Sequence, residues 1–312
     1  MTPLVHRALL YGGQDDILDV TVPFLRSGLE SGEAILAVIP SVHIEALRDT
    51  FGDDAEAMTF IDAADWYEHP VRTVAAYNDF VHEAAPRRVR ALAEPIWHGR
   101  SPVQTVEWQR YESVVNVAFT GFGAQVICLY DKVRLDSEII SAALRTHPEV
   151  ADGGRPGSGA ARSSDAFVDP AAFNAECDSS PLPPPAGAVE SLPIAREDDL
   201  HELRAFVTER ARRHRQADAS LSNLLVAVTE IATNALRHGT PPVTLRVWAE
   251  DTDLVCEVAD HGQWDRHALL GFLPPKSATA GGFGLWAARM LVDVAQVRSG
   301  GSGTVVRLHT AL

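Results

Sequence analysis

The chain has 312 residues, of which 46% are hydrophobic and 22% are charged. This length and composition predict two domains, each with enough apolar residues to bury a core. The formal net charge is −15, and both halves of the chain are acidic. Because nucleic acid is itself polyanionic, this balance disfavours direct binding to DNA or RNA.

The cysteines and the apolar segments exclude further classes of protein. Cys128, Cys177 and Cys256 lie far apart without paired spacing, so neither a disulfide framework nor a zinc knuckle is expected. The N-terminus carries no apolar core of a signal peptide, and no run of about 18 apolar residues occurs. We therefore expect a soluble, cytoplasmic protein with no membrane segment.

Residues 1–150 alternate between short apolar strands and helical segments, which predicts an α/β domain with a mostly parallel sheet. The predicted strands are 8–11, 34–39, 58–61, 90–93 and 126–130, and the predicted helices are 16–31, 43–50, 71–83, 104–121 and 136–146. Such sheets bind ligands beyond the carboxyl ends of their strands. Here these ends are followed by residues 11–16, 62, 94–98 and 130–131.

This first domain lacks the phosphate loop G-x-x-x-x-G-K-[ST]. The order HRALLYGG, FLRSGLESGEAILAVIP, AEPIWHG, WQRYESVVN, ICLYD and a closing His147–Pro148 resembles the MEDS sensory domain. That family is named for sensors of methanogens and methylotrophs, and it is similar to a RecA or KaiC core without a phosphate loop. The resemblance covers most of residues 4–150 and implies that the domain senses a small molecule, whose identity it leaves open.

Eight residues match the pattern of that family: His6, Tyr11, Glu94, Trp97, Tyr111, Glu112, Cys128 and Asp131. Six of them are candidates for a sensory pocket: Tyr11, Glu94, Trp97, Tyr111, Cys128 and Asp131. Structural roles compete with this one, since Glu94 and Asp131 could cap helices and Trp97 and Tyr111 could belong to the core. A metal site made of His6, His98 and Cys128 is disfavoured, because these residues follow no ligand spacing.

Residues 151–190 are rich in Gly, Pro, Ser and Ala, which predicts a linker between two domains. Within it the run PLPPP favours an extended polyproline II spacer. Phe167 and Phe173 would allow part of the segment to dock on a domain.

Residues 191–312 predict a second domain with strands at 191–195, 243–249, 254–260, 295–299 and 304–308 and helices at 198–214, 221–239 and 285–292. A loop with helix-forming ends at 267–270 and proline stops at Pro274 and Pro275 precedes the last helix. This order predicts an α+β sandwich, in which a mixed sheet carries helices on one face.

The helix at 221–239 carries an apolar side and, opposite to it, Glu230, Asn234 and His238 at one-turn spacing. Ser220 could cap its start and Gly239 could end it. Taken alone, these polar residues are typical of an ordinary surface helix. A magnesium–nucleotide site could instead use the carboxylate as a base and the amide oxygen as a metal ligand.

Three later motifs favour the nucleotide interpretation. Asp260 ends an apolar strand and Gly262 follows, so that the carboxylate could accept a hydrogen bond from an exocyclic amine while the glycine admits a flat base. The glycines of the G-G-F-G-L sequence at 281–285 begin a helix, where backbone N–H groups can face phosphate. Thr304 begins the last strand and could reach the same base.

This combination of motifs, in this order, resembles the Bergerat-fold ATPases, the group that includes gyrase, histidine kinases and MutL. The short domain and the block E-I-A-T-N-A-L-R-H-G look most like the anti-sigma serine kinases of the RsbW and SpoIIAB type, over roughly residues 195–310. The resemblance implies ATP and Mg²⁺ as cofactors, with Glu230 as catalytic base, Asn234 as Mg²⁺ ligand and Asp260 as adenine reader. The other implied cofactor-binding residues are His238, Gly262, Gly281, Gly282, Gly284, Leu285 and Thr304.

The implied activity is phosphorylation of a serine on an anti-sigma-factor antagonist, together with sequestration of a sigma factor and dimerisation through the ATP domain. Two departures from the family pattern, Trp264 in place of a glycine and Phe283 in place of an arginine, favour as an alternative a nucleotide-binding switch that sequesters a partner without turnover. A sensor histidine kinase is a second alternative. The linker takes the place of its dimerisation helices, and His201 and His214 fall within the first helix of the ATP domain.

Overall fold

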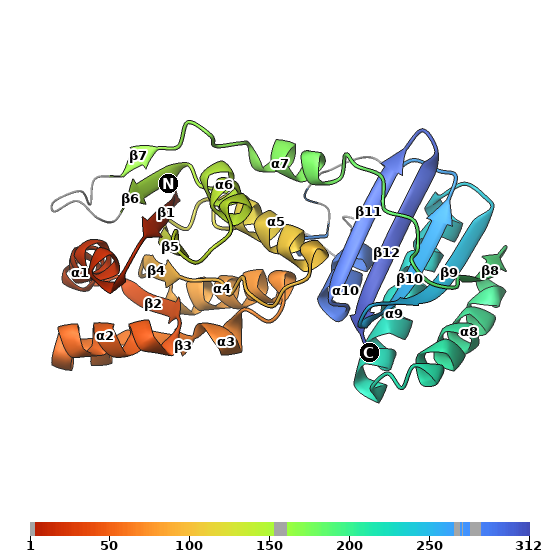
Figure 1. Cartoon of the computed structure of the whole chain (residues 1–312), viewed down its shortest axis with the longest axis horizontal. Helices are drawn as coiled ribbons and strands as arrows, with labels where there is room; N and C mark the ends of the chain where they lie inside the picture. The colour runs from red at the N-terminus through yellow and green to blue at the C-terminus, as the bar shows by residue number, and fades with distance from the viewer. Residues whose placement is uncertain (1–3, 153–160, 265–268, 270, 275–281) are drawn as a thin grey trace. The chain divides into compact units, whose positions relative to one another are not determined.

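The computed structural model describes residues 4–152, 161–264, 269, 271–274 and 282–312. The chain forms two compact units, Met1–Phe173 and Asn174–Leu312 (Figure 1). Most of the segment expected to be helical at 267–270, and Pro275 of the expected proline stops, lie outside the described residues.

A seven-stranded sheet forms the centre of the first unit, in the order β3-β2-β4-β5-β1-β6-β7. Its strands are β1 (Val5–Tyr11), β2 (Ala34–Ile39), β3 (Met58–Asp62), β4 (Val89–Ala93), β5 (Gln125–Asp131), β6 (Glu149–Asp152) and β7 (Arg162–Ser163). All neighbours run parallel except β6 and β7. The mostly parallel sheet expected from the sequence is therefore confirmed, and the two short strands β6 and β7 extend it at one edge.

Helices connect the parallel strands, as crossover connections require. They are α1 (Gln14–Glu30), α2 (Ser41–Phe51), α3 (Ala63–Trp66), α4 (Pro70–Ala84), α5 (Pro102–Ala118) and α6 (Ser137–Thr146), with a 3₁₀ turn η1 (Gly52–Ala57) after α2 and a further helix α7 (Pro170–Cys177). The start of α5 is fixed by a capping box, in which Ser101 and Gln104 bond each other's backbone N–H groups.

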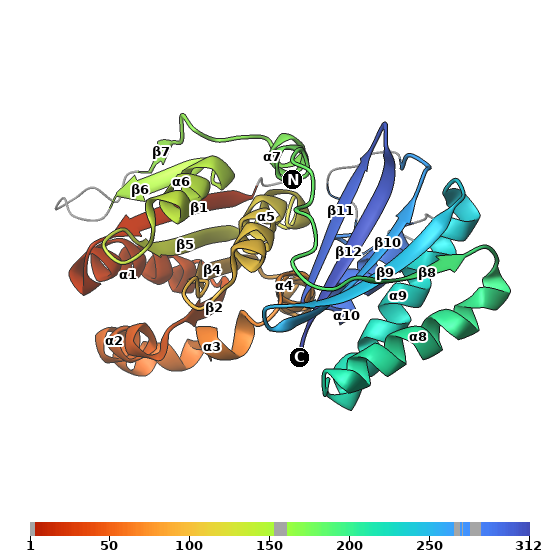
Figure 2. The ribbon, with the colours of Figure 1, turned by 45° about the vertical axis from the view of Figure 1, so that its right-hand side comes forward.

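The two faces of this sheet differ in chemistry. Side chains alternate along each strand, so that Leu9 and Leu129 face α1 and α2 within an aliphatic core cluster. His6 and Cys128 lie on the opposite face, together with Tyr130. There the α4–α6 layer supplies buried aromatic and polar side chains in addition to aliphatic ones (Figure 2).

The second unit is a five-stranded sheet in the order β11-β12-β10-β9-β8. Its elements are β8 (Glu190–Ile194), the 3₁₀ turn η2 (Glu197–Asp199), α8 (Leu200–Arg213), α9 (Asp218–His238), β9 (Val243–Glu250), β10 (Asp253–Asp260), α10 (Phe283–Leu291), β11 (Val294–Gly300) and β12 (Gly303–Ala311). Every neighbouring pair is antiparallel, so the expectation of a mixed sheet was wrong. The two helices α8 and α9 begin and end at the same end of the sheet, where Ile194 at the end of β8 pairs with Val243 at the start of β9, so β9 runs antiparallel to β8.

Helix α9 is the central core element of this unit. Its apolar side is buried against the strands and α10, through Leu221, Leu224, Ala227, Val228, Ile231, Ala232 and Ala235. The helix begins at Asp218, earlier than the cap expected at Ser220, and ends at Gly239 as expected. It is long and apolar enough to cross a membrane by composition, but its buried side shows it to be a core helix of this unit.

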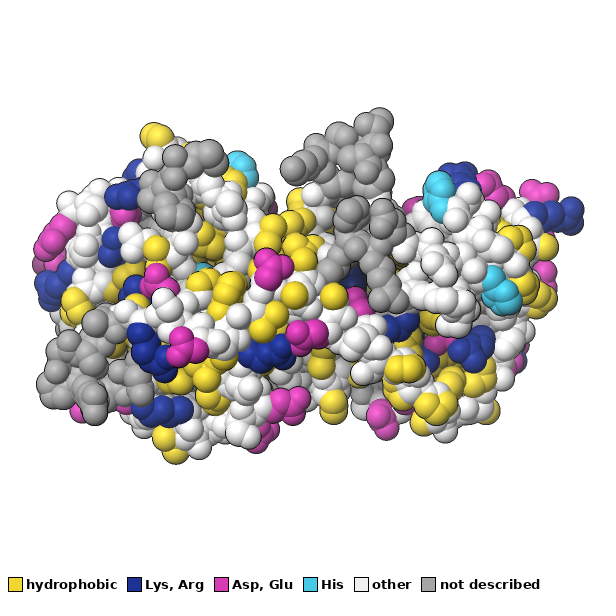
Figure 3. Space-filling view, turned by 90° about the horizontal axis from the view of Figure 1, so that it is seen from above, with side chains coloured by type: hydrophobic (Ala, Val, Ile, Leu, Met, Phe, Trp, Pro, Cys, Tyr) yellow, Lys and Arg dark blue, Asp and Glu magenta, His cyan; other side chains and the backbone are white. Residues whose placement is uncertain are grey.

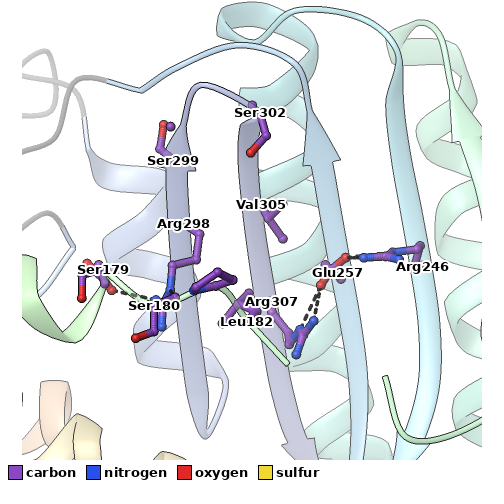
Figure 4. A pocket seen from close by; sticks show the side chains of 14 residues that line it. Ser179, Ser180, Leu182, Arg246, Glu257, Arg298, Ser299, Ser302, Val305 and Arg307 are labelled. Carbon is purple, nitrogen blue, oxygen red and sulfur yellow. Dashed lines mark hydrogen bonds and ion pairs between the residues drawn. The ribbon is translucent and has the colours of Figure 1, made fainter. Parts of the chain in front are cut away.

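The face of the sheet away from α9 carries a buried ion cluster. Glu257 is fully buried and accepts hydrogen bonds from Arg307, at 2.7 and 2.9 Å, and from Arg246. A segment of the expected linker crosses this face: Arg298 binds Asp178 and the Ser180 carbonyl, and Arg307 donates to the Pro183 carbonyl. Figure 4 shows this arrangement, with the helices behind the strands and the segment in front of them.

Replacing Glu257 by alanine should destabilise the second unit by about 3 kcal/mol or more, because Arg307 would stay buried without its carboxylate. Urea unfolding followed by circular dichroism measures this loss. Arg246→Ala is the matched control: its side chain is partly exposed, and its removal leaves the Glu257–Arg307 pair intact, so a smaller loss is expected. A loss below 1 kcal/mol for Glu257→Ala would contradict the assignment of this cluster as a stabilising element.

Candidate functional site

Helices α9 and α10 meet at the polar side of α9. Glu230 and Asn234 lie one turn apart and are half-buried. Gly284 of α10 sits directly against both: a Cβ atom added to this glycine would lie 2.7 Å from Nδ2 of Asn234 and 3.2 Å from Oε2 of Glu230. A side chain at this position would force Asn234 to shift and would crowd Glu230. The glycine therefore leaves the carboxylate and the amide undisturbed beside the start of α10.

The start of α10 itself is set by Gly282, whose left-handed φ of +81° is readily adopted by glycine. The first backbone N–H groups of a helix have no partner within the helix, so the N-terminus of α10 can receive a negative charge. Leu285 points the other way, into the core. Gly281 lies outside the described residues, and His238 is exposed in the last turn of α9.

Asp260 fixes the end of β10 to the end of α9. Its side chain is 4% exposed, and its Oδ1 accepts hydrogen bonds from the backbone N–H groups of Thr240 at 3.1 Å and Gly262 at 2.6 Å. A Cβ atom on Gly239 would lie 2.5 Å from this carboxyl group, so the glycine is required for the approach. Neither hydrogen bond involves Oδ2, which therefore keeps its capacity to accept a hydrogen bond from a ligand.

Thr304 holds the turn after Asp260 through an ordered chain of hydrogen bonds. Its hydroxyl donates to the Gly262 carbonyl at 2.9 Å, so the Ser299 hydroxyl, 2.9 Å away, must donate to Thr304. Ser299 in turn accepts from the backbone N–H of Trp264 at 2.8 Å. Thr304, expected to contact a base directly, is thus also the residue that orients Gly262.

The structure gathers the expected residues into two groups, Glu230 with Asn234 and Gly284, and Asp260 with Gly262 and Thr304. Glu230 and Asn234 lie on α9, and Asp260 accepts a hydrogen bond from the backbone N–H of Thr240, just beyond the end of this helix. The sequence interpretation missed Thr240 and Ser299. Thr240 contributes only its backbone, which leaves no signal in the side-chain pattern, and Ser299 looks like any polar residue at the end of a strand.

A pocket in the first unit lies at the carboxyl ends of the strands, where the sheet topology predicts a ligand. Its lining includes Tyr11, Glu94, Trp97 and Asp131 of the expected sensory pocket, with His43 and Arg134 in addition. Tyr11 donates a hydrogen bond of 2.6 Å to Glu94. Burial, opposed by this hydrogen bond, raises the pKa of Glu94 to about 7.

The remaining two candidates, Tyr111 and Cys128, do not line this pocket. Both are buried, Tyr111 among the rings of Tyr67 and Trp108, and Cys128 beside His6. His98 lines the pocket and is exposed, so the set of His6, His98 and Cys128 considered from the sequence does not come together.

Charged side chains of both signs are interspersed on the face drawn in Figure 3, and the basic ones do not gather there in one patch.

Two family models match the chain, one within each of its two compact units. Residues 5–148 match the family model of the MEDS domain, described as the methanogen/methylotroph, DcmR sensory domain. Residues 194–310 match the model of the histidine kinase-like ATPase domain. No curated protein matches the chain.

Two solved structures resemble part of the chain. One contains the RsbU and RsbW domains of Rv1364c from Mycobacterium tuberculosis, with 21% identity, a TM-score of 0.31, and 39% of this chain aligned to 32% of that one. Another is the blue-light activated histidine kinase of Erythrobacter litoralis, with 20% identity, a TM-score of 0.25, and 38% of this chain aligned to 42% of that one. The matched region covers less than half of either protein.

Replacing Gly284 by alanine should weaken ATP binding at least about tenfold, because the new methyl group would displace Asn234 and Glu230. Titration with a fluorescent ATP analogue measures the change. Gly301→Ala is the matched control, since a Cβ atom there meets nothing within 4 Å. Equal affinities for the two variants would show that the contact between α9 and α10 has no part in nucleotide binding.

Glu94 predicts a pH dependence of stability in the first unit. The pKa of Glu94 in the folded protein is about 7, above its ordinary value of 4.5. The stability that this raised pKa contributes to the folded state is therefore fully present below pH 4.5 and is lost as pH rises through 7. The loss is up to about 3 kcal/mol. Burial lowers the pKa of His6 to about 4, which gives an opposite slope over an overlapping range.

The diagnostic quantity is therefore the difference between wild type and Glu94→Gln in urea unfolding from pH 4.5 to 8. The wild type should lose stability relative to the variant as pH rises. Parallel curves for the two proteins would contradict the raised pKa.

Proposed function

We propose that this chain, which joins a MEDS sensory domain to a histidine kinase-like ATPase domain, is a cytoplasmic ATP-binding regulator of the anti-sigma type. In this proposal the second domain sequesters a sigma factor and phosphorylates a serine of an anti-sigma-factor antagonist. A small molecule bound at the pocket of the first domain biases the choice between these partners. The observation that carries the proposal is the packing of Gly284 against Glu230 and Asn234.

The residues present fit a magnesium–nucleotide complex. Asn234 offers an amide oxygen as a metal ligand, beside a helix start suited to phosphate. Oδ2 of Asp260 could accept a hydrogen bond from the adenine amine, because Oδ1 is already held by two backbone N–H groups. Mg²⁺, when bound, would neutralise charge on the phosphates.

Glu230 is the proposed catalytic base. It would orient the serine hydroxyl of the antagonist and accept its proton, while the chain holds the reacting groups in position. Phosphoryl transfer depends mainly on positioning and charge stabilisation, so a small site of this kind is sufficient. We further propose that the domain dimerises, as the resemblance to RsbW and SpoIIAB implies.

A switch without turnover is the second candidate function. Trp264 replaces a glycine of the family pattern, and here it packs against the core and donates its backbone N–H to Ser299. Such anchoring would restrict the loop that follows Asp260. Tight Mg-ATP binding in calorimetry, without product formation, would favour this candidate.

The sensor histidine kinase is not retained. It requires a pair of dimerisation helices ahead of the ATPase domain, whereas residues 161–189, all of them described, contain a single eight-residue helix, α7.

Incubation of the full chain with labelled ATP, Mg²⁺ and the cognate antagonist should yield phosphoserine on the antagonist. Glu230→Gln should lower the rate at least about 100-fold and retain nucleotide binding, because only the base is removed. The matched control is Glu202→Gln, which replaces an exposed carboxylate on α8 and should have wild-type activity. Absence of phosphoserine, or wild-type activity in Glu230→Gln, would overturn the kinase assignment.

A further inference from the structure

Four buried side chains of the first unit point their donor atoms at one another. His6 of β1, Glu112 of α5, Cys128 of β5 and His147 at the end of α6 each offer one atom, and these atoms all lie within 4.8 Å of one another. None of the four residues is more than 2% exposed. The cluster lies on the face of the sheet covered by α5 and α6, and nothing in the proposed kinase function uses it.

His147 presents an unprotonated nitrogen to this cluster. Its Nδ1 lies 2.8 Å from the Ala143 carbonyl, which can only accept, so Nδ1 carries the proton. In the neutral ring Nε2 then holds a lone pair, and this atom faces Oε2 of Glu112 at 3.4 Å. A lone pair and a carboxylate oxygen repel each other unless a cation or a proton lies between them.

His6 is oriented in the same way. The amide of Asn116 donates to the Ser113 and Thr146 carbonyls, which leaves its Oδ1 as an acceptor for Nδ1–H of His6 at 3.1 Å. Nε2 of His6 therefore also points its lone pair inward, 3.6 Å from Oε2 of Glu112.

This orientation is the one that metal-binding histidines adopt, with the outer ring nitrogen bonded to a carbonyl oxygen and the inner one free for the metal. Neither oxygen of Glu112 has a hydrogen-bond partner among the described residues, although the side chain is buried. Burying a carboxylate without hydrogen-bond partners costs free energy, and a cation bound in the cluster would offset this cost.

We propose that His6, Glu112, Cys128 and His147 bind a divalent transition-metal ion of the Zn²⁺ class within the first domain. Two imidazoles, one carboxylate and one thiolate are a donor set that suits Zn²⁺, whereas Ca²⁺ and Mg²⁺ prefer oxygen ligands in larger number. The carboxylate and the thiolate together balance the charge of the ion. Burial of all four ligands marks the site as a closed, structural one.

The distances suit tetrahedral coordination. Metal bonds of about 2.0–2.3 Å place neighbouring ligand atoms roughly 3.3–3.6 Å apart. Sγ of Cys128 lies 3.4 Å from Nε2 of His6, and Oε2 of Glu112 lies 3.6 and 3.4 Å from Nε2 of His6 and of His147. The other pairs of ligand atoms lie within 4.8 Å. Small adjustments of the side chains therefore complete the site.

Metal binding must release the thiol proton of Cys128 to solvent. The thiolate, and not the thiol, is the form of cysteine that binds a metal ion. The metal replaces that proton and forms the metal–sulfur bond, with no change of oxidation state. Affinity should therefore increase as pH rises.

The site lies close to the proposed sensory pocket. The ring of Tyr130 is 5.5 Å from that of His147 and 6.1 Å from that of Trp97, which lines the pocket. Tyr130 thus separates the metal site from the pocket within one domain.

The test is metal analysis of the purified full chain, followed by replacement with Co²⁺. We expect about one Zn²⁺ per chain and, with Co²⁺, the visible bands of tetrahedral coordination together with a thiolate-to-metal charge-transfer band. His147→Gln should weaken Zn²⁺ binding at least about tenfold, and Cys128→Ser should remove the charge-transfer band. The matched controls His98→Gln and Cys177→Ser carry the same chemistry outside the cluster and should retain both properties.

Zn²⁺ affinity unchanged in His147→Gln, or a charge-transfer band that persists in Cys128→Ser, would overturn the proposal. If these variants fail to fold, the wild-type Co²⁺ spectrum decides, since a spectrum without a thiolate band excludes Cys128 as a ligand. Kinase activity is not needed for any of these measurements, so failure here is distinguishable from failure of the proposed function.

Discussion

The buried carboxylate of Asp260 is the constraint on which the second domain depends. Its Oδ1 accepts the backbone N–H groups of Thr240 and Gly262, which join the end of α9 to the end of β10. Because Glu230 and Asn234 lie on the same helix, this link fixes their place relative to Asp260 as well. Gly239 and Gly284 permit the close approaches, and Thr304 holds the turn from β12. The hydrogen bonds around Asp260 thus help to position the groups that the proposed nucleotide site requires.

The first domain separates two roles by the two faces of its sheet. One face is aliphatic and serves stability, and the other contains aromatic rings and the cluster around Glu112. The pocket at the carboxyl ends of the strands combines a carboxyl group of raised pKa with a tyrosine that donates to it. A ligand bound there would meet a carboxyl group whose charge changes near pH 7.

Much of the fold follows from the sequence, because hydrophobic period and glycine placement are local signals. The parallel sheet of the first domain and the helix carrying Glu230 and Asn234 could be predicted in this way. The antiparallel order of the second sheet could not be predicted, since it depends on the helix pair α8 and α9 beginning and ending at the same end of the sheet. The grouping of His6 with His147 was also missed, because these residues are 141 positions apart in the chain and are joined only by strand register and helix packing. The backbone role of Thr240 leaves no trace in side-chain chemistry.

The most direct test of the nucleotide site is calorimetry of Mg-ATP binding to wild type and Asp260→Asn. The asparagine can keep an oxygen toward Thr240 and Gly262 but places an amide donor where the adenine amine needs an acceptor. We therefore predict an intact fold with at least about tenfold weaker binding, while Asp251→Asn, in an exposed turn with a φ of +51° that asparagine tolerates, binds as wild type. Equal affinity of Asp260→Asn and wild type would contradict the account.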